Sequence, residues 1–535
     1  MYFDISGALG RPWVAHIMVT SAIRAPAAVP VTASPPVPAP FTFRLALGLV
    51  GVLLATLTAG INGRITSIAL ADLRGAFGLG FDAGTWVTAS YVAAEVAAMF
   101  IAPWLAVTFS LRRFGITMSL VFAGLGLLCP FAPDADSLIL LRILQGLAAG
   151  SLPPLLMTAA LRFLPWHAKI YGLGAYALTA TFGPNLALPL SALWTESIGW
   201  EWVFWQVVPP CLLGSVLIGY GLPQDPLRLE RFKRADWQGA LLGCSGIVCL
   251  VLALEQGERL DWLNSELIRA LLVSAAVLLP LFVLNEWFHP EPLIKLQLFA
   301  RRNFAYGVST LALMMLVVTA GNLPLLYMSQ VHGFRPVQVA PLALGHALAQ
   351  LLLAPLVATL INRRSVDARW VAGSGLLLMM VACVVGSQLT SAWAIENFYL
   401  IQALQAVGQP MVVVSLLMIS TGVVHPMEGP FASAMVNGIR GICTVIGAVL
   451  MEVLLSHREQ FHSFVLLDHV GSRPELWNGG SLAAFAGRVR DQAHVLAMAD
   501  TYLAVIAVLI SMLVLLVFLP TRAYPPQPPA IARPR

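Results

Sequence analysis

Charged residues are scarce in this 535-residue chain. Asp, Glu, Lys and Arg together make up 11% of it, whereas 58% of the residues are hydrophobic. Soluble domains carry about 25% charged residues, so this chain has too little polar surface to be stable in water. The net charge of +5 is small, and the basic residues are scattered between apolar runs. The composition therefore favours a membrane protein over a soluble or nucleic-acid-binding protein.

Cysteine is also rare, and the motifs of several enzyme classes are missing. The six cysteines all lie within apolar runs, without metal-ligand spacing and without a readable disulfide framework. We expect them to be small hydrophobic side chains in packed helices. The chain contains no P-loop, no HExxH, no GxSxG and no clustered metal ligands. We therefore expect no cofactor, no metal site and no enzymatic activity.

The two ends of the chain differ from the apolar remainder. Residues 26–40 form a Pro/Ala-rich segment that cannot be helical throughout, and no signal peptide is recognisable before it. We expect 1–43 to be a disordered cytoplasmic tail and 520–535 to be a second cytoplasmic tail. A start codon further downstream, at Met18, is the alternative for the first segment.

Long apolar runs fill the rest of the chain. A helix needs roughly 20 apolar residues to cross the hydrocarbon core of a bilayer. On that basis we predict an all-α polytopic membrane protein with about fourteen transmembrane helices. The predicted spans are 44–70, 85–108, 114–132, 137–160, 169–192, 203–222, 237–254, 267–288, 304–329, 338–361, 369–389, 395–422, 430–455 and 498–519.

The Lys and Arg residues predict the orientation, because they are enriched in cytoplasmic loops. With the N-terminus in the cytoplasm, twenty of the 31 Lys and Arg residues lie in cytoplasmic segments, eight on the opposite side and three within spans. We therefore expect a multi-pass protein of the inner (plasma) membrane with both termini in the cytoplasm. The long loop 456–497 would then lie outside.

Similar polar patterns recur in the two halves of the chain. The fourth span contains Arg142 and Gln145, and the twelfth contains Gln402 and Gln405. Each pair is spaced i, i+3, so its two side chains share one face of the helix. The pairs correspond in position if the seventh and eighth spans are an insertion.

This correspondence predicts the domain organisation. The basic pairs at 112–113 and 363–364 follow the second and the tenth span, which are also equivalent positions. We expect two six-helix bundles, at 44–222 and 304–519, joined by a two-helix insertion at 223–303. Related halves that meet at a site near the midplane are typical of transporters.

Seven short motifs along the chain carry a resemblance to a known family. In order, they are Gly84–Tyr91, Leu141–Gly146, Gly183–Pro184, Trp200–Pro209, Gly257–Trp262, Leu298–Phe304 and Asn437–Arg440. The chain resembles the major facilitator superfamily and, within it, the fourteen-span drug:proton antiporters of the EmrB/QacA type. This resemblance implies the major facilitator fold and multidrug efflux driven by the proton motive force. It also implies a periplasmic adaptor and an outer-membrane channel as partners, in a host with two membranes.

Three positions depart from the pattern of that family. Asn62 stands where the first span of the relatives carries an acidic residue, and Val107 stands at the acidic position of the loop after the second span. The antiporter motif ends in Ala187 and Leu188 instead of two glycines. These changes alter the usual gating contact and leave Glu95 as the one carboxylate that we can place deep in the first six spans.

The polar residues of the spans are candidate site residues, because ionisable groups are costly in a bilayer. We expect Glu95 to carry the proton, with Arg64 and Arg142 as the cations that tune it. The expected substrate cavity consists of Asn62, Gln145, Gln405, Asn437 and Arg440. The expected gating motif consists of Gly183, Pro184, Arg112 and Arg113.

Each of these residues also has a purely structural interpretation, such as an interhelical hydrogen bond or a packed turn. His346 and Gln350, one turn apart in the tenth span, are either a proton relay or a satisfied pair in the core.

The leading functional hypothesis is secondary active transport, namely proton-coupled efflux of drugs or other small amphipathic compounds. An exporter of one specific metabolite, natural product or siderophore is the alternative within the same fold. A non-transporting membrane receptor or a membrane enzyme is the alternative from another class.

Overall fold

The computed structural model describes residues 41–165, 168–363, 365–472 and 481–519, and helices dominate these ranges. The tails expected at 1–43 and 520–535 therefore lie almost wholly outside the described residues. The first six predicted spans form these helices: α1 (Phe43–Ile68), α2 (Leu70–Phe77), α3 (Phe81–Phe109), α4 (Leu111–Leu128), α5 (Ala135–Gly150), α6 (Leu152–Phe163), α7 (Lys169–Ala180), α8 (Phe182–Leu193), α9 (Trp202–Trp205) and α10 (Val208–Gly221).

The remaining eight predicted spans are helical as well. The insertion consists of α11 (Trp237–Gly257) and α12 (Glu266–Phe288). The later helices are α13 (Arg302–Thr319), α14 (Leu323–Val331), α15 (Pro336–Ile361), α16 (Ala368–Gly386), α17 (Phe398–Thr421), α18 (Gly429–Ser472) and α19 (Leu482–Val517). The prediction of an all-α polytopic protein with about fourteen spans is confirmed.

Thirteen stretches of the described chain are long and apolar enough to cross a membrane. The fifth predicted span is not among them because it is broken at Thr181 into α7 and α8, which have 12 residues each. The bend expected at Gly183 and Pro184 is thus present as a break just before them. Pro184 lies in the first turn of α8, where its missing N–H removes no helix hydrogen bond.

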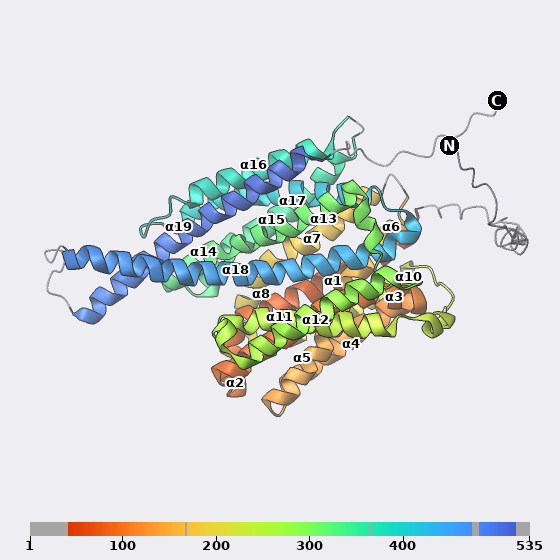
Figure 1. The fold of residues 1–535 in the computed structure, drawn as a ribbon, viewed down its shortest axis with the longest axis horizontal. Helices are drawn as coiled ribbons and strands as arrows, with labels where there is room; N and C mark the ends of the chain where they lie inside the picture. The colour runs from red at the N-terminus through yellow and green to blue at the C-terminus, as the bar shows by residue number, and fades with distance from the viewer. Residues whose placement is uncertain (1–40, 166–167, 364, 473–480, 520–535) are drawn as a thin grey trace, which may run out of the picture. The chain divides into compact units, whose positions relative to one another are not determined.

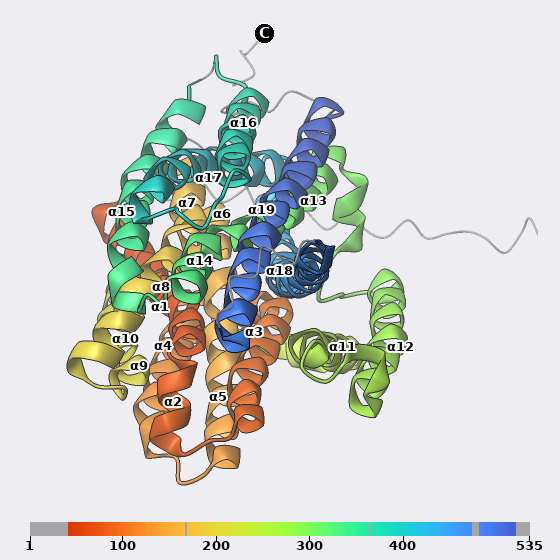
Figure 2. The same ribbon diagram turned by 90° about the vertical axis from the view of Figure 1, so that its left-hand side faces the viewer.

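Helix contacts fall into two sets, which we call the N-terminal helices (α1–α10) and the C-terminal helices (α13–α19). The two sets meet where α3, α6, α7 and α8 contact α15, α17 and α18. Figure 2 shows α11 and α12 together at the side of the molecule, with α11 next to α3. The insertion therefore lies against one set and reaches the boundary with the other, since α11 also contacts α18.

Glycine sets the spacing between α3 and α5. A Cβ atom at Gly146 would overlap the backbone oxygen of Tyr91, and one at Gly150 would overlap the backbone oxygen of Glu95. Small residues four positions apart allow helix backbones to touch, which is a common packing mode in membranes. This contact fixes the segment of α3 that carries Glu95.

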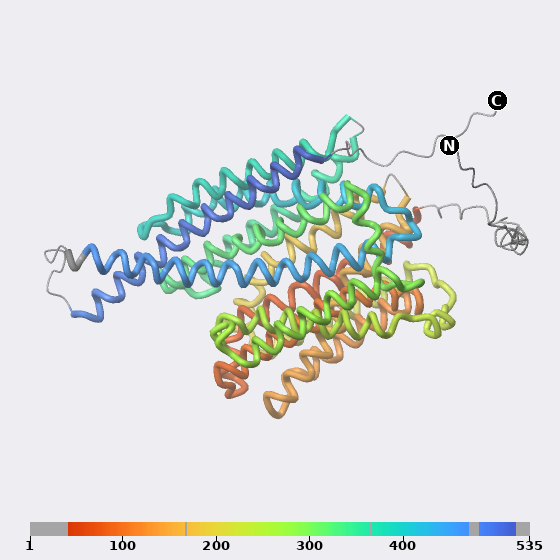
Figure 3. Tube along the Cα trace, viewed as in Figure 1, coloured from red at the N-terminus to blue at the C-terminus, as the bar shows by residue number. Residues whose placement is uncertain are grey.

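The stretch 456–497 was expected to be a long outside loop, but most of it continues the two neighbouring helices. α18 has 44 residues and α19 has 36, and their joined ends project beyond the other helices (Figures 1 and 3). Asp500 accepts hydrogen bonds from Arg458 (2.7 Å) and His462 (2.6 Å). Some charged residues of this stretch, such as Arg458 and Glu459, thus form ion pairs between the two helices of a hairpin.

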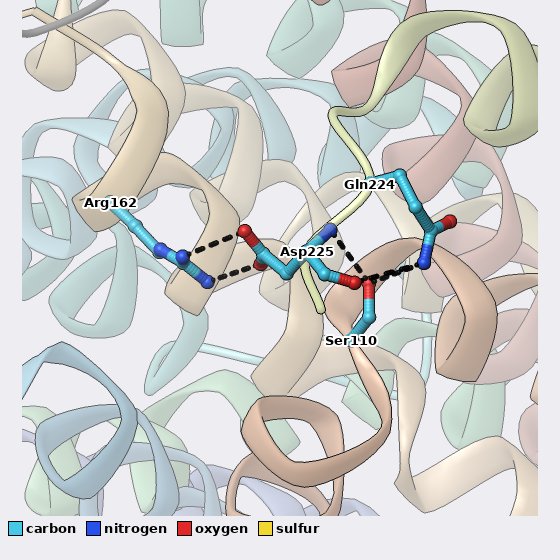
Figure 4. Close-up of polar contacts among 4 residues, drawn as sticks. All are labelled: Ser110, Arg162, Gln224 and Asp225. Carbon is cyan, nitrogen blue, oxygen red and sulfur yellow. Dashed lines mark hydrogen bonds and ion pairs between the residues drawn. The ribbon is translucent and has the colours of Figure 1, made fainter. Parts of the chain in front are cut away.

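A one-residue turn joins α3 to α4 at Ser110, where φ is 76°. The Ser110 hydroxyl accepts hydrogen bonds from the backbone N–H of Asp225 (3.3 Å) and from Gln224 (3.4 Å). Figure 4 shows that the Asp225 carboxylate in turn accepts two hydrogen bonds from Arg162, at 2.7 and 3.0 Å. The end of α3, the end of α6 and the segment after α10 are thereby tied together.

We predict that Asp225→Asn lowers the free energy of unfolding by about 1 kcal/mol, because a partly exposed two-bond ion pair contributes about that much. The measurement is the melting temperature of the purified protein in lipid nanodiscs. Glu230→Gln, which removes an exposed acid from the same segment, is the matched control and should melt like the wild type. Equal melting temperatures for the two variants would contradict the prediction.

Candidate functional site

A cavity of about 340 Å³ lies between the N-terminal and the C-terminal helices. α1, α3, α7 and α8 line it on one side, and α13 and α18 line it on the other. Most of the wall is apolar or small, as at Val96, Met99 and Met315. Four charged side chains interrupt this surface: Arg64, Glu95, Glu255 and Arg440.

Three of these four charged groups lack a direct partner. Within the described ranges, Arg64, Glu95 and Glu255 make no hydrogen bond and no ion pair shorter than 4.0 Å. All three are half-buried, and they interact through the electric field across the cavity. A charged group that faces a cavity without a partner is available to bind an ion or exchange a proton.

Glu95 lies in the middle of α3, opposite Gly63 of α1. Because Gly63 has no side chain, α1 can approach here: a Cβ atom at Gly63 would lie 2.9 Å from the Tyr91 ring and 3.8 Å from Oε2 of Glu95. Arg440 of α18 is the cation that acts most strongly on Glu95, followed by Arg142 and Arg64. The acid of one set of helices therefore faces a cation of the other set.

One face of α18 is hydrogen-bonded to the N-terminal helices, and we call these contacts the latch. The hydrogen bonds run from Ser433 to the backbone oxygen of Pro154 (2.7 Å), from Tyr176 to Asn437 (2.7 Å) and from Arg440 to Thr179 (3.1 Å). Near the start of α18, Gly429 packs on Leu161. The cavity begins at Arg440 and extends along α18 to Ala448, so the latch closes one end of it.

Arg142, expected as a cation that tunes Glu95, does not line the cavity wall. Its side chain is 0% exposed and donates a hydrogen bond to Gln145 (2.6 Å). The guanidinium carbon lies 3.9 Å from the centre of the Tyr91 ring, a cation–π contact. Arg142 therefore acts on Glu95 only from behind Tyr91.

Of the five residues expected at the substrate cavity, only Arg440 lines it. Asn62 is fully buried beside Tyr91, and Gln145 is fully buried beside Arg142. Asn437 belongs to the latch, and Gln405 is 3% exposed and away from the wall. These amides fill contacts between helices, which is the structural interpretation that the sequence left open.

The residues of the expected gating motif are dispersed. Pro184 lines the cavity, and Gly183 packs towards Ile61 of α1. Arg112 and Arg113 lie in the first turn of α4, and neither has a hydrogen bond or an ion pair in the described part of the chain.

His346 belongs to a buried amide cluster. Its Nε2 lies 2.9 Å from the amide nitrogen of Gln350. That nitrogen donates a hydrogen bond to Gln409 (2.6 Å), and the amide oxygen of Gln350 accepts one from Asn185 (3.3 Å). The geometry therefore favours the core interpretation of His346 over a proton relay at the cavity.

Sequence reasoning missed Glu255. The seventh span was predicted to end at residue 254, whereas α11 continues to Gly257 and carries Glu255 to the cavity wall. Hydropathy could not have located it, because the apolar run ends at Leu254 and Gln256, Gly257 and Glu258 follow Glu255.

The comparisons with known proteins agree with this geometry. The family model described as Major Facilitator Superfamily matches residues 52–319. The chain is 27% identical to the multidrug export protein EmrB of Haemophilus influenzae, over 78% of this chain and 82% of that protein. It is 26% identical to the fatty acid resistance protein FarB of Neisseria gonorrhoeae, again over 78% and 82%.

A solved structure supports the same fold. The human organic anion transporter TETRAN matches with a TM-score of 0.54 at 12% identity, over 88% of this chain and 99% of that chain. Together with the family match and the apolar helices, this identifies a multi-pass membrane protein that is a transporter and not an enzyme. The chain belongs to the major facilitator superfamily, and it has EmrB-type export proteins among its relatives.

Proposed function

We propose that this transporter exports small amphipathic compounds in exchange for protons across the inner (plasma) membrane. The observation that carries the proposal is Glu95, an unpaired carboxylate at the wall of a mostly apolar cavity between the two sets of helices. The apolar wall suits the hydrophobic part of such a compound. The names of relatives, a multidrug export protein and a fatty acid resistance protein, support an amphipathic substrate class.

Glu95 suits proton coupling because few other groups there can titrate. Asn62 and Val107 stand at two positions where the family pattern has an acidic residue, and neither side chain can release a proton. Arg64 and Arg440 line the same wall and bring guanidinium groups, which carry no exchangeable carboxyl proton, to it. A proton and a cationic substrate would compete for Glu95, and this competition gives exchange by direct exclusion.

Protonation of Glu95 would also act on the latch. Glu95 belongs to α3 and Arg440 to α18, so their attraction holds the two sets of helices together. A proton on Glu95 removes this attraction and leaves the hydrogen bonds of the latch to hold that end alone. In the expected orientation the latch is on the cytoplasmic side, so proton uptake from outside would favour opening towards the cytoplasm.

A second candidate substrate class has its own support in the cavity. Arg64 and Arg440 would also fit the carboxylate of an amphipathic anion, and FarB is named for fatty acid resistance. Export of one metabolite, natural product or siderophore fits the same geometry. Transport assays with a cationic dye and with a fatty acid separate these classes.

The proposed partners are the substrate, protons, the lipid bilayer and, in a host with two membranes, a periplasmic adaptor with an outer-membrane channel. The helical hairpin of α18 and α19 is the candidate contact, because it projects beyond the other helices (Figure 1). Crosslinking from this hairpin tests the proposal.

We predict that Glu95→Gln abolishes proton-driven efflux, because glutamine keeps the size of the side chain but cannot exchange a proton. Glu95→Asp should keep part of the activity. The measurement is efflux and substrate-induced proton release by the purified protein in liposomes, from about pH 5.5 to about pH 8.5. A Glu95→Gln variant with wild-type efflux and pH profile would place the proton on another group.

We also predict that Tyr176→Phe shifts the protein towards the state in which the latch is open. The variant leaves the buried side-chain oxygen of Asn437 without the hydrogen bond from Tyr176, at a cost of about 1–3 kcal/mol to the closed state. Ala358 is buried beside Gly174, near the latch. A cysteine introduced there as a reporter (Ala358→Cys) should then react faster with a maleimide when Tyr176→Phe is also present. Tyr327→Phe is the control, because Tyr327 bonds within the C-terminal helices, to Thr390. Equal labelling rates in both variants would contradict a role of the latch.

A further inference from the structure

The insertion contributes one charged side chain to the cavity, and its position is well fixed. Gln256 of α11 accepts hydrogen bonds from Thr85 of α3 (3.4 Å) and from Arg259 (2.7 Å). Arg259 is in turn ion-paired with Asp82 at the start of α3. These contacts hold Glu255, the residue before Gln256, at the wall of the cavity.

Arg64 lies between two carboxylates and is bonded to neither. Its strongest electrostatic partner is Glu255, and Glu95 comes second. The Arg64 guanidinium is carried on a long flexible side chain, so small movements bring it towards one acid or the other. The cavity wall contains two acids and two arginines in all, which makes it formally neutral when both acids are ionised.

The other charged groups around Glu255 are few. Glu95 of α3 and Arg440 of α18 share the cavity wall with it, Glu452 of α18 acts on it electrostatically, and Glu258 and Arg259 follow just after the end of its helix. The residues of α13 at the wall, Met315, Val318 and Thr319, are uncharged. Within this set, Arg64 is the group through which Glu255 can act on Glu95.

We propose that Glu255 is a positioning residue for proton coupling. Its carboxylate competes with the carboxylate of Glu95 for Arg64 and balances the second positive charge of the cavity. This inference rests on the proposed function of Glu95. When Arg64 is drawn to Glu255, Glu95 loses one of the three cations that act on it and binds a proton more readily. When Arg64 returns to Glu95, the proton is released. The two-helix insertion is thereby part of the coupling machinery.

The test is the pH profile of substrate-driven proton exchange by Glu255→Gln in liposomes. Loss of the negative charge leaves the cavity with a net positive charge, which disfavours proton binding at Glu95. The midpoint should therefore move to lower pH, by about one pH unit. Glu258→Gln is the matched control, because Glu258 lies one turn further on and accepts a hydrogen bond from Trp262 (2.9 Å) outside the cavity. Equal midpoints in the two variants would overturn the proposal.

Two further variants test the route of action. In an Arg64→Gln background, Glu255→Gln should shift the midpoint by much less, because the two residues act as a unit. Additive shifts would show that Glu255 does not act through Arg64. Glu255→Asp keeps the charge and should keep the midpoint near the wild-type value. If the midpoint of Glu255→Asp were as low as that of Glu255→Gln, this would count against the proposal. Glu255→Ala replaces Glu255→Gln if the glutamine variant fails to fold.

The outcome also separates this inference from the proposed function. If Glu95→Gln is inactive and Glu255→Gln has a wild-type profile, only the role of Glu255 is wrong. If Glu95→Gln retains proton-driven transport, the proposed role of Glu95 fails first.

Discussion

The cost of placing a charge in hydrocarbon governs the interior of this protein. A charged side chain at the centre of a membrane needs a partner, a polar cavity or an aromatic face. Arg142 uses an aromatic face and one amide, since it lies against the Tyr91 ring and bonds to Gln145. Arg64, Glu95, Glu255 and Arg440 instead gather at one cavity, where opposite charges balance. The charges are thus concentrated at the boundary between the two sets of helices.

Helix packing determines where these charges sit. Gly146 and Gly150 bring the backbone of α3 against α5, and this contact fixes Glu95. Gly51 and Gly214 allow a similar approach between α1 and α10, on the helix that carries Arg64. The N-terminal helices therefore form a tightly packed body. The boundary with α18 combines close packing, as at Gly438 against Phe100, with the hydrogen bonds of the latch.

The sequence predicted the helices better than their faces. A run of about 20 apolar residues is specific enough to locate a span, and all fourteen appear as helical segments. Composition cannot tell whether an amide such as Asn62 or Gln145 points to a cavity or to a neighbouring helix, and here both point to neighbours. Glu255 was missed because a span boundary was drawn one residue early. The hairpin of α18 and α19 was missed because ion pairs between two helices, such as Arg458 with Asp500, resemble the composition of a loop.

The departure from the family at Asn62 has a physical consequence for coupling. Asn62 is buried beside Tyr91, and Arg142 lies against the same ring. An acid at this position would lie near Arg142 and away from the cavity wall. In this chain Arg142 has the Tyr91 and Phe204 rings and Gln145 as partners, and two of its nitrogens are unpaired among the described residues. The acids at the cavity wall are then Glu95 and Glu255, which lie there together with Arg64 and Arg440.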